Sequence, residues 1–333
     1  MKYEKFGTAD GGVTIGKYTV ENQNASLTVM NFGAIVTDFC VFGRNIVGGF
    51  DNFSEYLEDD SHQGGTIGRV ANRVAGAKFE MDGRVYNLPK NDGENCLHGG
   101  LGFDRRIWNV TEHSATRIKL EYSSADGEEG FPSRLDVSVT YTLLDSGFAV
   151  EYLAVPYGKT PIALTNHSYF NLDGLGGNIE AHKVAIFADT YTEVGADLIP
   201  CGNRPLVDGT EFDLRAPRAI SDCLSDSFIG HDHNFNLSVK EYLNILGIKA
   251  GLAATVENDD LKMSVYTDQP ALQFYIGNFL GSGPDFRGGV PQVRHGAMCL
   301  ETQTEPNCIN RGEGFYDKGS AYTHFTAYVV EKK

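Results

Sequence analysis

The chain has 333 residues, of which 41% are hydrophobic and 22% are charged, a balance typical of ordinary globular proteins that excludes wholesale disorder. Its formal charge of −16 argues against nucleic acid or an anionic membrane as a partner, because clustered Lys and Arg bind phosphate. We therefore expect a small neutral ligand as the partner.

The N-terminus, MKYEKFGTADGG, carries no apolar run typical of a signal peptide, and the chain contains no stretch of about 18 apolar residues. We expect a cytoplasmic protein. Six cysteines lie apart from one another without a CxxC pair, which predicts neither a zinc site nor a disulfide framework: Cys40, Cys96, Cys201, Cys223, Cys299 and Cys308.

Short runs in which apolar and polar residues alternate predict antiparallel strands along most of the chain. Residues 25–42 are expected to form two strands around Asn31–Gly33, and residues 53–57 a single helical turn. Further strands are expected at 117–124, 134–144, 148–155, 161–165, 182–194, 233–239, 252–258, 261–268, 271–280, 297–303 and 324–330. Only 216–224 and 241–247 suggest additional short helices. The pattern predicts one all-β domain over residues 1–333, a large antiparallel β-sandwich.

The stretch 164–174, LTNHSYFNLDG, puts His167 where an expected strand ends. The sheet holds the backbone there while the side chain remains open to a cleft, and catalytic groups are often found in such places. An imidazole that only fixes a turn fits this stretch equally well.

Other polar residues stand out against the β-strand pattern: Asn72 with Arg73 in GRVANR, His98 in NCLHGG, Asp232 in HDHNF, Gln273 in ALQFY and Glu301 in CLETQTEP. Glu301 is the most informative, because it follows four apolar residues on an expected central strand, where a carboxylate is costly unless it is partnered. The alternative is a strand position that faces solvent.

The sequence contains no motif that indicates a metal site, a nucleophilic serine or a phosphate-binding loop. His231 and His233 flank Asp232 at strand spacing, but tetrahedral zinc needs three or four protein ligands, and we predict no metal. No GxSxG elbow is present, and the glycine-rich loop around His98 lacks the GK[ST] ending of a phosphate-binding loop.

The motifs GRVANR, NCLHGG, TNHSYFNL, DHNF, ALQFYIGNFL and CLETQTEPNCIN, in this order between residues 64 and 310, closely resemble the galactose mutarotase (aldose 1-epimerase) family. The resemblance implies a galactose mutarotase-like supersandwich, an open sugar cleft and catalysis without a cofactor. It matches Glu301 to the catalytic base and His167 to the acid, with His98 beside them, and it assigns sugar contacts to Asn72, Arg73, Asp232 and Gln273. Within GRVANR, the contact falls on Arg73 and not on Arg69.

The expected reaction interconverts the α and β anomers of free aldohexoses such as galactose and glucose. A base takes the proton of the anomeric hydroxyl while an acid protonates the ring oxygen, so that the ring opens. A sugar-phosphate 1-epimerase, a carbohydrate-binding protein without activity, and a retaining glycosidase that uses Asp232 and Glu301 are the alternatives. We expect a monomer or a homodimer.

Four positions depart from the family pattern: Glu94, Thr304, Glu305 and Asn307. None of them is a proposed acid or base. They bear on sugar preference more than on the reaction.

Overall fold

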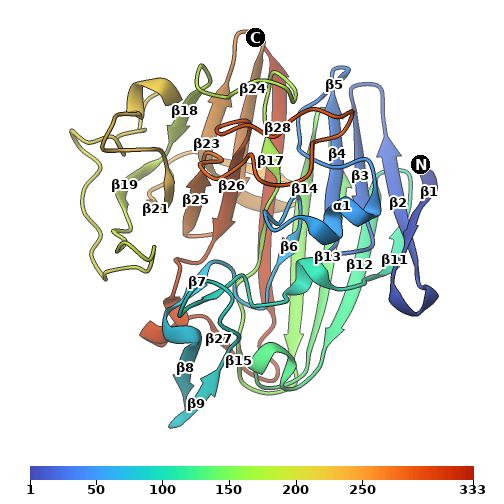
Figure 1. Ribbon diagram of the computed structural model, residues 1–333, viewed down its shortest axis with the longest axis vertical. Coiled ribbons are helices and arrows are strands. Elements are labelled where there is room, and N and C mark those ends of the chain that lie inside the picture. The colour runs from blue at the N-terminus through green and yellow to red at the C-terminus, as the bar shows by residue number, and fades with distance from the viewer.

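The computed structural model describes residues 1–333, and nearly all of its regular structure is antiparallel β-sheet (Figure 1). The largest sheet has ten strands. Its strands, in spatial order, are β11 (Asn109–His113), β12 (Arg117–Ser124), β13 (Leu135–Leu143), β14 (Gly147–Pro156), β28 (Tyr322–Lys332), β24 (Leu261–Thr267), β23 (Ile248–Glu257), β18 (Lys183–Ile186) and β20 (Arg218–Ala219), with β22 (Tyr242–Ile245) paired to β23.

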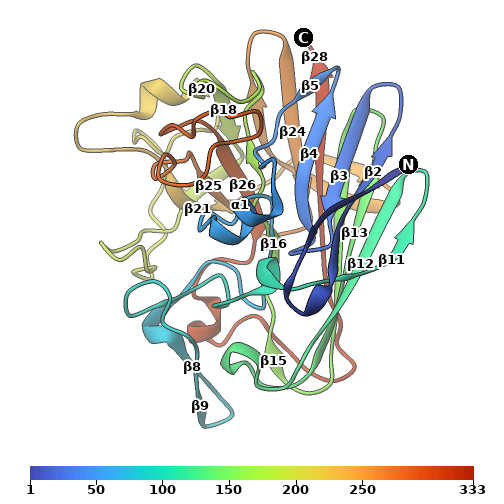
Figure 2. The same cartoon turned by 45° about the vertical axis from the view of Figure 1, so that its right-hand side comes forward.

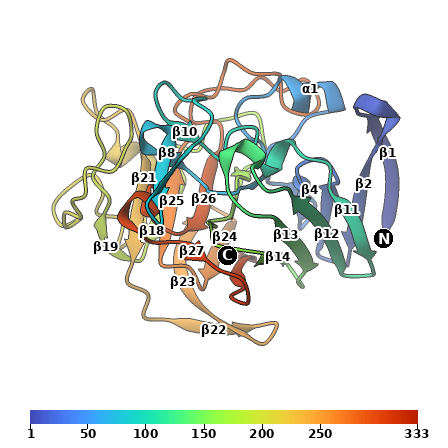
Figure 3. The ribbon, with the colours of Figure 1, turned by 90° about the horizontal axis from the view of Figure 1, so that it is seen from below.

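Two five-stranded sheets face the large sheet (Figures 2 and 3). The first consists of β1 (Lys2–Thr8), β2 (Thr14–Glu21), β3 (Ala25–Met30), β4 (Ile35–Val41) and β5 (Arg44–Asn45). The second, which we call the site sheet, runs in the order β17 (Tyr169–Phe170), β26 (Met298–Gln303), β25 (Ala271–Tyr275), β21 (Asp232–Leu237) and β19 (Ala188–Tyr191).

Four two-stranded ladders and a few short helical turns complete the chain. The ladders pair β6 (Thr66–Ile67) with β16 (Thr165–Asn166), β7 (Arg73–Val74) with β10 (Cys96–Leu97), β8 (Lys78–Met81) with β9 (Arg84–Asn87), and β15 (Thr160–Pro161) with β27 (Phe315–Tyr316). The helical turns are α1 (Phe53–Glu58) and the 3-10 turns Asp10–Gly12, Ala75–Ala77, Phe103–Arg105, Glu128–Gly130, Ile220–Cys223 and Cys308–Arg311. No helix is long and apolar enough to cross a membrane.

Aromatic side chains join the layers. The ring of Phe148, on the large sheet, lies 4.9 Å from the ring of Phe39 on β4, and Tyr328, also on the large sheet, lies 4.9 Å from Phe170 on the site sheet. The Tyr328 hydroxyl also donates a hydrogen bond to the carbonyl of Leu300 on β26. Because both smaller sheets pack on the same face of the large sheet, one continuous core holds the site sheet in place.

Most of the expected elements are confirmed. The two strands within 25–42 are β3 and β4, the three successive strands are β12, β13 and β14, and the expected helical turn is α1. A capping box between Asn52 and Glu55 starts that turn. The expected strand at 161–165 is present only at its two ends, in β15 and β16.

The helix expected at 241–247 is wrong. These residues form β22, which turns back into β23 through Leu246 and Gly247. Both turn residues have positive φ, 54° and 86°, as a two-residue hairpin turn with the twist of the strands requires. The helix expected at 216–224 is present only as a 3-10 turn at Ile220–Cys223, after the short strand β20.

Candidate active site

Glu301 lies on β26, between β17 and β25 in the site sheet, and is 2% exposed. All six residues of β26 are buried, so the solvent-facing alternative for Glu301 is wrong. Its Oε2 atom has no hydrogen-bond partner. An unpartnered carboxylate oxygen in a buried position is costly, and such exceptions are characteristic of functional sites.

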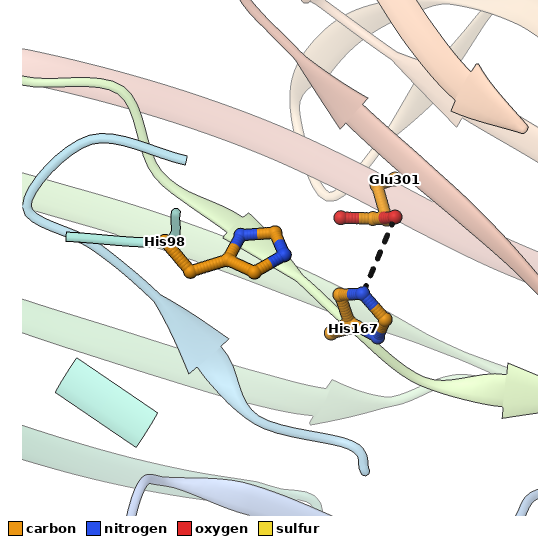
Figure 4. Close-up of side chains that lie close together, drawn as sticks. All are labelled: His98, His167 and Glu301. Atoms are coloured by element: carbon orange, nitrogen blue, oxygen red, sulfur yellow. Dashed lines mark ion pairs between the residues drawn. The ribbon is translucent and has the colours of Figure 1, made fainter. Parts of the chain in front are cut away.

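His167 follows directly after β16, which confirms its place at a strand end. Its backbone N–H donates to Gly65 and its carbonyl accepts from Gly64, so the neighbouring chain fixes the turn on both sides. The ring points at the carboxylate of Glu301, with 3.6 Å between Nε2 and Oε1 (Figure 4). The two residues, 134 positions apart in sequence, therefore form one buried pair.

His98 joins this pair from the β7–β10 ladder (Figure 4). The backbone N–H of Asn72 donates to His98 Nδ1 at 3.2 Å, so the remaining ring nitrogen, Nε2, is left to serve the site. The ring centroids of His98 and His167 are 5.2 Å apart. Asn72 and His98 both adopt left-handed backbone conformations, with φ of 61° and 54°. Such conformations are uncommon outside glycine and cluster at functional sites.

Asp232 and Arg73 bring two more charged groups to the site, and both act on Glu301. Gln273 donates to Asp232 Oδ1 at 2.7 Å, and Arg73 Nε lies 2.7 Å from Asp92. Gln273 is also the direct β-ladder partner of Glu301. It lies behind the pocket, where it fixes Asp232.

These groups surround an open pocket of about 160 Å³. Of the seven residues selected from the sequence, Gln273 does not line the pocket. The other six do: Asn72, Arg73, His98, His167, Asp232 and Glu301. Tyr169, Tyr275 and Phe279 give it an aromatic wall. Phe279 is 66% exposed, which is unusual for a phenylalanine and leaves an apolar ring facing the opening.

Burial dominates the protonation of the central groups. It raises the pKa of Glu301 well above the usual value, and Asp232 adds to the rise, while Arg73 opposes it. Burial and the neighbouring His62 lower the pKa of His167 to about 3, and the same causes hold the pKa of His98 well below its usual value. Both imidazoles are therefore neutral at neutral pH.

Sequence reasoning missed several pocket residues. One of them is His62, and the residues just before it in the chain, Asp59, Asp60 and Ser61, line the pocket as well. Four more lining residues come from the segment after β25: Leu280, Ser282, Gly283 and Gln292. In the sequence, the only signal for His62 is that it precedes the expected turn QGG. In the structure, its backbone is left-handed, with φ of 60°.

Arg69 and Arg73 have different positions despite sharing one motif. Arg69 is 2% exposed and donates hydrogen bonds to the carbonyls of Pro132 and Ser133 and to the hydroxyls of Ser124 and Thr160. It does not line the pocket, whereas Arg73 does. Of the two arginines, only Arg73 is therefore placed to meet a ligand in the pocket, and that contact stays a prediction.

His231 and His233 do not reach the pocket. His231 is fully buried, and both rings pack against Phe212 and Phe228.

In the pocket itself, His98, His167 and Glu301 bring three potential metal-ligand atoms within 4.8 Å of one another. We propose no metal role for them, because the resemblance matches Glu301 and His167 to the catalytic base and acid and implies catalysis without a cofactor. The four departures from the family pattern also lie outside the pocket lining.

Comparison with known proteins agrees with this architecture. Residues 16–329 match the family model described as Aldose 1-epimerase. Galactose mutarotase from Mus musculus is 38% identical over 328 residues, covering 95% of this chain and 94% of the mouse protein. Aldose 1-epimerase from Escherichia coli (strain K12) is 36% identical over 285 residues, covering 82% of this chain and 81% of that protein.

Solved structures give the same result. Galactose 1-epimerase from Lactobacillus acidophilus NCFM superposes with a TM-score of 0.88 at 25% identity, covering 99% of this chain and 98% of that chain. An aldose epimerase homologue from C. elegans has the same TM-score at 24% identity, covering 96% and 99%, and shows the fold alone. The fold and the relatives define a sugar isomerase of the galactose mutarotase-like type. The chain belongs to the aldose 1-epimerase family.

Proposed function

We propose that this protein is an aldose 1-epimerase that interconverts the α and β anomers of free aldohexoses such as galactose and glucose. The observation that carries the proposal is the buried pair of His167 and Glu301, 3.6 Å apart beside an open polar pocket. A carboxylate and an imidazole fixed in this way are the two groups that ring opening needs, a base and an acid. The proposed catalytic unit is one domain that spans residues 1–333, supported by the match over 16–329 and the continuous core.

Glu301 is the proposed base. Its Oε2 has no hydrogen-bond partner within the protein, and we assign this oxygen the proton of the anomeric hydroxyl. The raised pKa of Glu301 makes the carboxylate a stronger base than an exposed glutamate. When it takes the proton, the electrons of the O–H bond form the C1–O1 double bond, and the bond between C1 and the ring oxygen breaks.

His167 is the proposed acid, with His98 beside it. The ring oxygen takes the electron pair of the broken bond and needs a proton as it leaves C1. Rotation about the C1–C2 bond then presents the other face of the aldehyde, and the same proton transfers in reverse close the ring. Each full cycle returns both protons, so no co-reactant is consumed.

Asn72, Arg73 and Asp232 are proposed to hold the hydroxyl groups of the sugar, with Gln273 supporting Asp232. Their charged and amide groups suit a neutral, hydroxyl-rich ligand, and the aromatic wall suits the apolar face of a sugar ring. A phosphorylated sugar fits less well. Arg73 is the only arginine or lysine that lines the pocket, and it is paired with Asp92. Asp59, Asp60 and Asp232 also line the pocket and would repel a phosphate group.

Polarimetry on freshly dissolved α-galactose tests the proposal, because the enzyme should accelerate the approach to the equilibrium rotation. Glucose and glucose 6-phosphate are compared in the same assay, and a nitrophenyl galactoside tests glycoside cleavage. Faster mutarotation of the free sugars without cleavage supports the proposal. Binding without any change in the rate of mutarotation would instead indicate a carbohydrate-binding protein, and release of nitrophenol a glycosidase.

A further inference from the structure

A third histidine lies beside the two that the sequence singled out. The ring centroid of His62 is 4.7 Å from that of His98 and 5.9 Å from that of His167, so three imidazoles line one pocket. His62 comes from the segment after α1, outside every motif discussed above. Its side chain is 15% exposed, compared with 8% for His167. His62 is therefore the more accessible of these two rings to protons from solvent.

A buried carboxylate orients His62. The Nδ1 atom of His62 lies 2.8 Å from Oδ2 of Asp104, whose side chain is 3% exposed. Burial alone would raise the pKa of Asp104, but His62 and Arg105 outweigh this effect and the pKa is lowered. Asp104 is therefore an anion at neutral pH. It fixes His62 Nδ1 as a donor and so holds the orientation of the ring, as the buried carboxylate does for the histidine of a catalytic triad.

Other charged groups also surround His62. Asp59 and Asp60, which come shortly before it in the chain, line the pocket as well and add negative charge. His98 and His167 face it as neutral rings, and a proton on His62 lowers the pKa of both. Arg105 partly offsets Asp104, with 3.4 Å between Arg105 Nε and Asp104 Oδ2. Arg73 and Glu301 line the pocket as well.

The neutral state of His167 leaves the proposed reaction without a ready proton. A neutral imidazole can give up its proton only by becoming an imidazolate, which is far too basic to form here. A protonated neighbour removes this difficulty.

We propose that His62, held by Asp104, is the residue that carries the proton for ring opening and supplies it to His167. This inference rests on the proposed aldose 1-epimerase activity. The proton leaves His62 and binds the lone pair of a His167 ring nitrogen, and His167 passes it to the ring oxygen as the C1–O bond breaks. Ring closure returns it along the same route, so His62 is a positioning residue and Glu301 remains the base.

Kinetics of His62→Gln and Asp104→Asn test the proposal. Glutamine keeps a polar side chain but cannot carry the proton, so kcat should fall about tenfold or more while KM changes little. Asp104→Asn should also lower kcat while KM changes little, because the ring of His62 loses the carboxylate that fixes its orientation. The double variant should be no slower than His62→Gln alone, since both changes remove one function. His113→Gln is the matched control, because His113 is a half-buried histidine far from the pocket, bonded to Thr19.

Two results would overturn the proposal. One is a His62→Gln enzyme with kcat within twofold of wild type and the same pH profile. The other is a change in KM alone, which would make His62 a binding residue. A wild-type enzyme without any mutarotation would refute the proposed function instead.

Discussion

Replacing Glu301 with glutamine removes one ionisable oxygen from the centre of the site and keeps the shape of the side chain. The carboxylate is 2% exposed, and its Oε2 has no partner, so no ion pair with a surface group is lost. A positioned general base typically contributes about 10²–10⁴-fold to the rate. At about 1.36 kcal/mol per tenfold, the variant should lose about 2.7–5.4 kcal/mol of transition-state stabilisation. Its kcat for α-galactose should fall by this factor.

The polarimeter measures this loss directly, after subtraction of the uncatalysed mutarotation. Circular dichroism shows whether the fold is intact. Glu305→Gln is the matched control: Glu305 is also a largely buried carboxylate, 7% exposed, but it pairs with Arg204 and Arg311 outside the pocket. The control should keep its catalytic rate. A Glu301→Gln enzyme within fivefold of wild type, with an intact fold, would refute the assignment of the base.

Four further outcomes are expected. His167→Asn should also slow mutarotation by orders of magnitude with an unchanged circular dichroism spectrum; a near wild-type rate would remove His167 from the mechanism. Arg73→Ala should raise KM for galactose as well as slow turnover, and steady-state kinetics would reveal an error if KM stayed constant. Arg69→Met should lower the unfolding free energy by about 3 kcal/mol or more in urea denaturation, because it removes the donor from the buried hydroxyls of Ser124 and Thr160 and from the half-buried carbonyls of Pro132 and Ser133; a loss under 1 kcal/mol would contradict that reasoning. In wild type, kcat/KM should fall with acid at a pH above 4.5, the usual pKa of glutamate, because burial raises the pKa of Glu301; an acid limb below 4.5 would count against it.

The raised pKa of Glu301 also has a consequence for stability. The folded chain holds a proton on Glu301 in a pH range where the unfolded chain has released it. This contribution to stability is fully present below the unfolded pKa and is lost as pH rises through the folded pKa. Glu301→Gln should therefore gain in melting temperature relative to wild type as pH rises from 4.5, and thermal denaturation across pH measures the difference.

The strands were largely predictable because apolar and polar residues alternate along a strand whose two faces differ in polarity. Residues 117–124 and 134–144 alternate clearly, and they form β12 and β13. The short apolar run in 241–247 fits both a helix and a strand, since Tyr242, Leu243 and Ile245 satisfy either period. The hairpin turn at Leu246 and Gly247 determines the outcome there, and its positive φ angles do not follow from a hydrophobic pattern.

The site was predictable where a motif marked it. Glu301 and His167 were selected from separate stretches, and the β-ladders bring them together. His62 was not found, because the role proposed for it depends on its hydrogen bond with Asp104, which lies 42 residues away and on a different element. A sequence shows neither that contact nor the distance between two imidazoles. The position of Gln273 behind Asp232 likewise depends on the register between β21 and β25.

The strand at the C-terminal end of the chain, β28, lies in the middle of the largest sheet, between β14 and β24. During synthesis, the facing edges of β14 and β24 therefore remain unpaired until residues 322–332 have left the ribosome. Unpaired edges of this kind are templates for association with other chains. Closure of the large sheet thus waits until β28 has been made, and a chain that stops before β28 should aggregate.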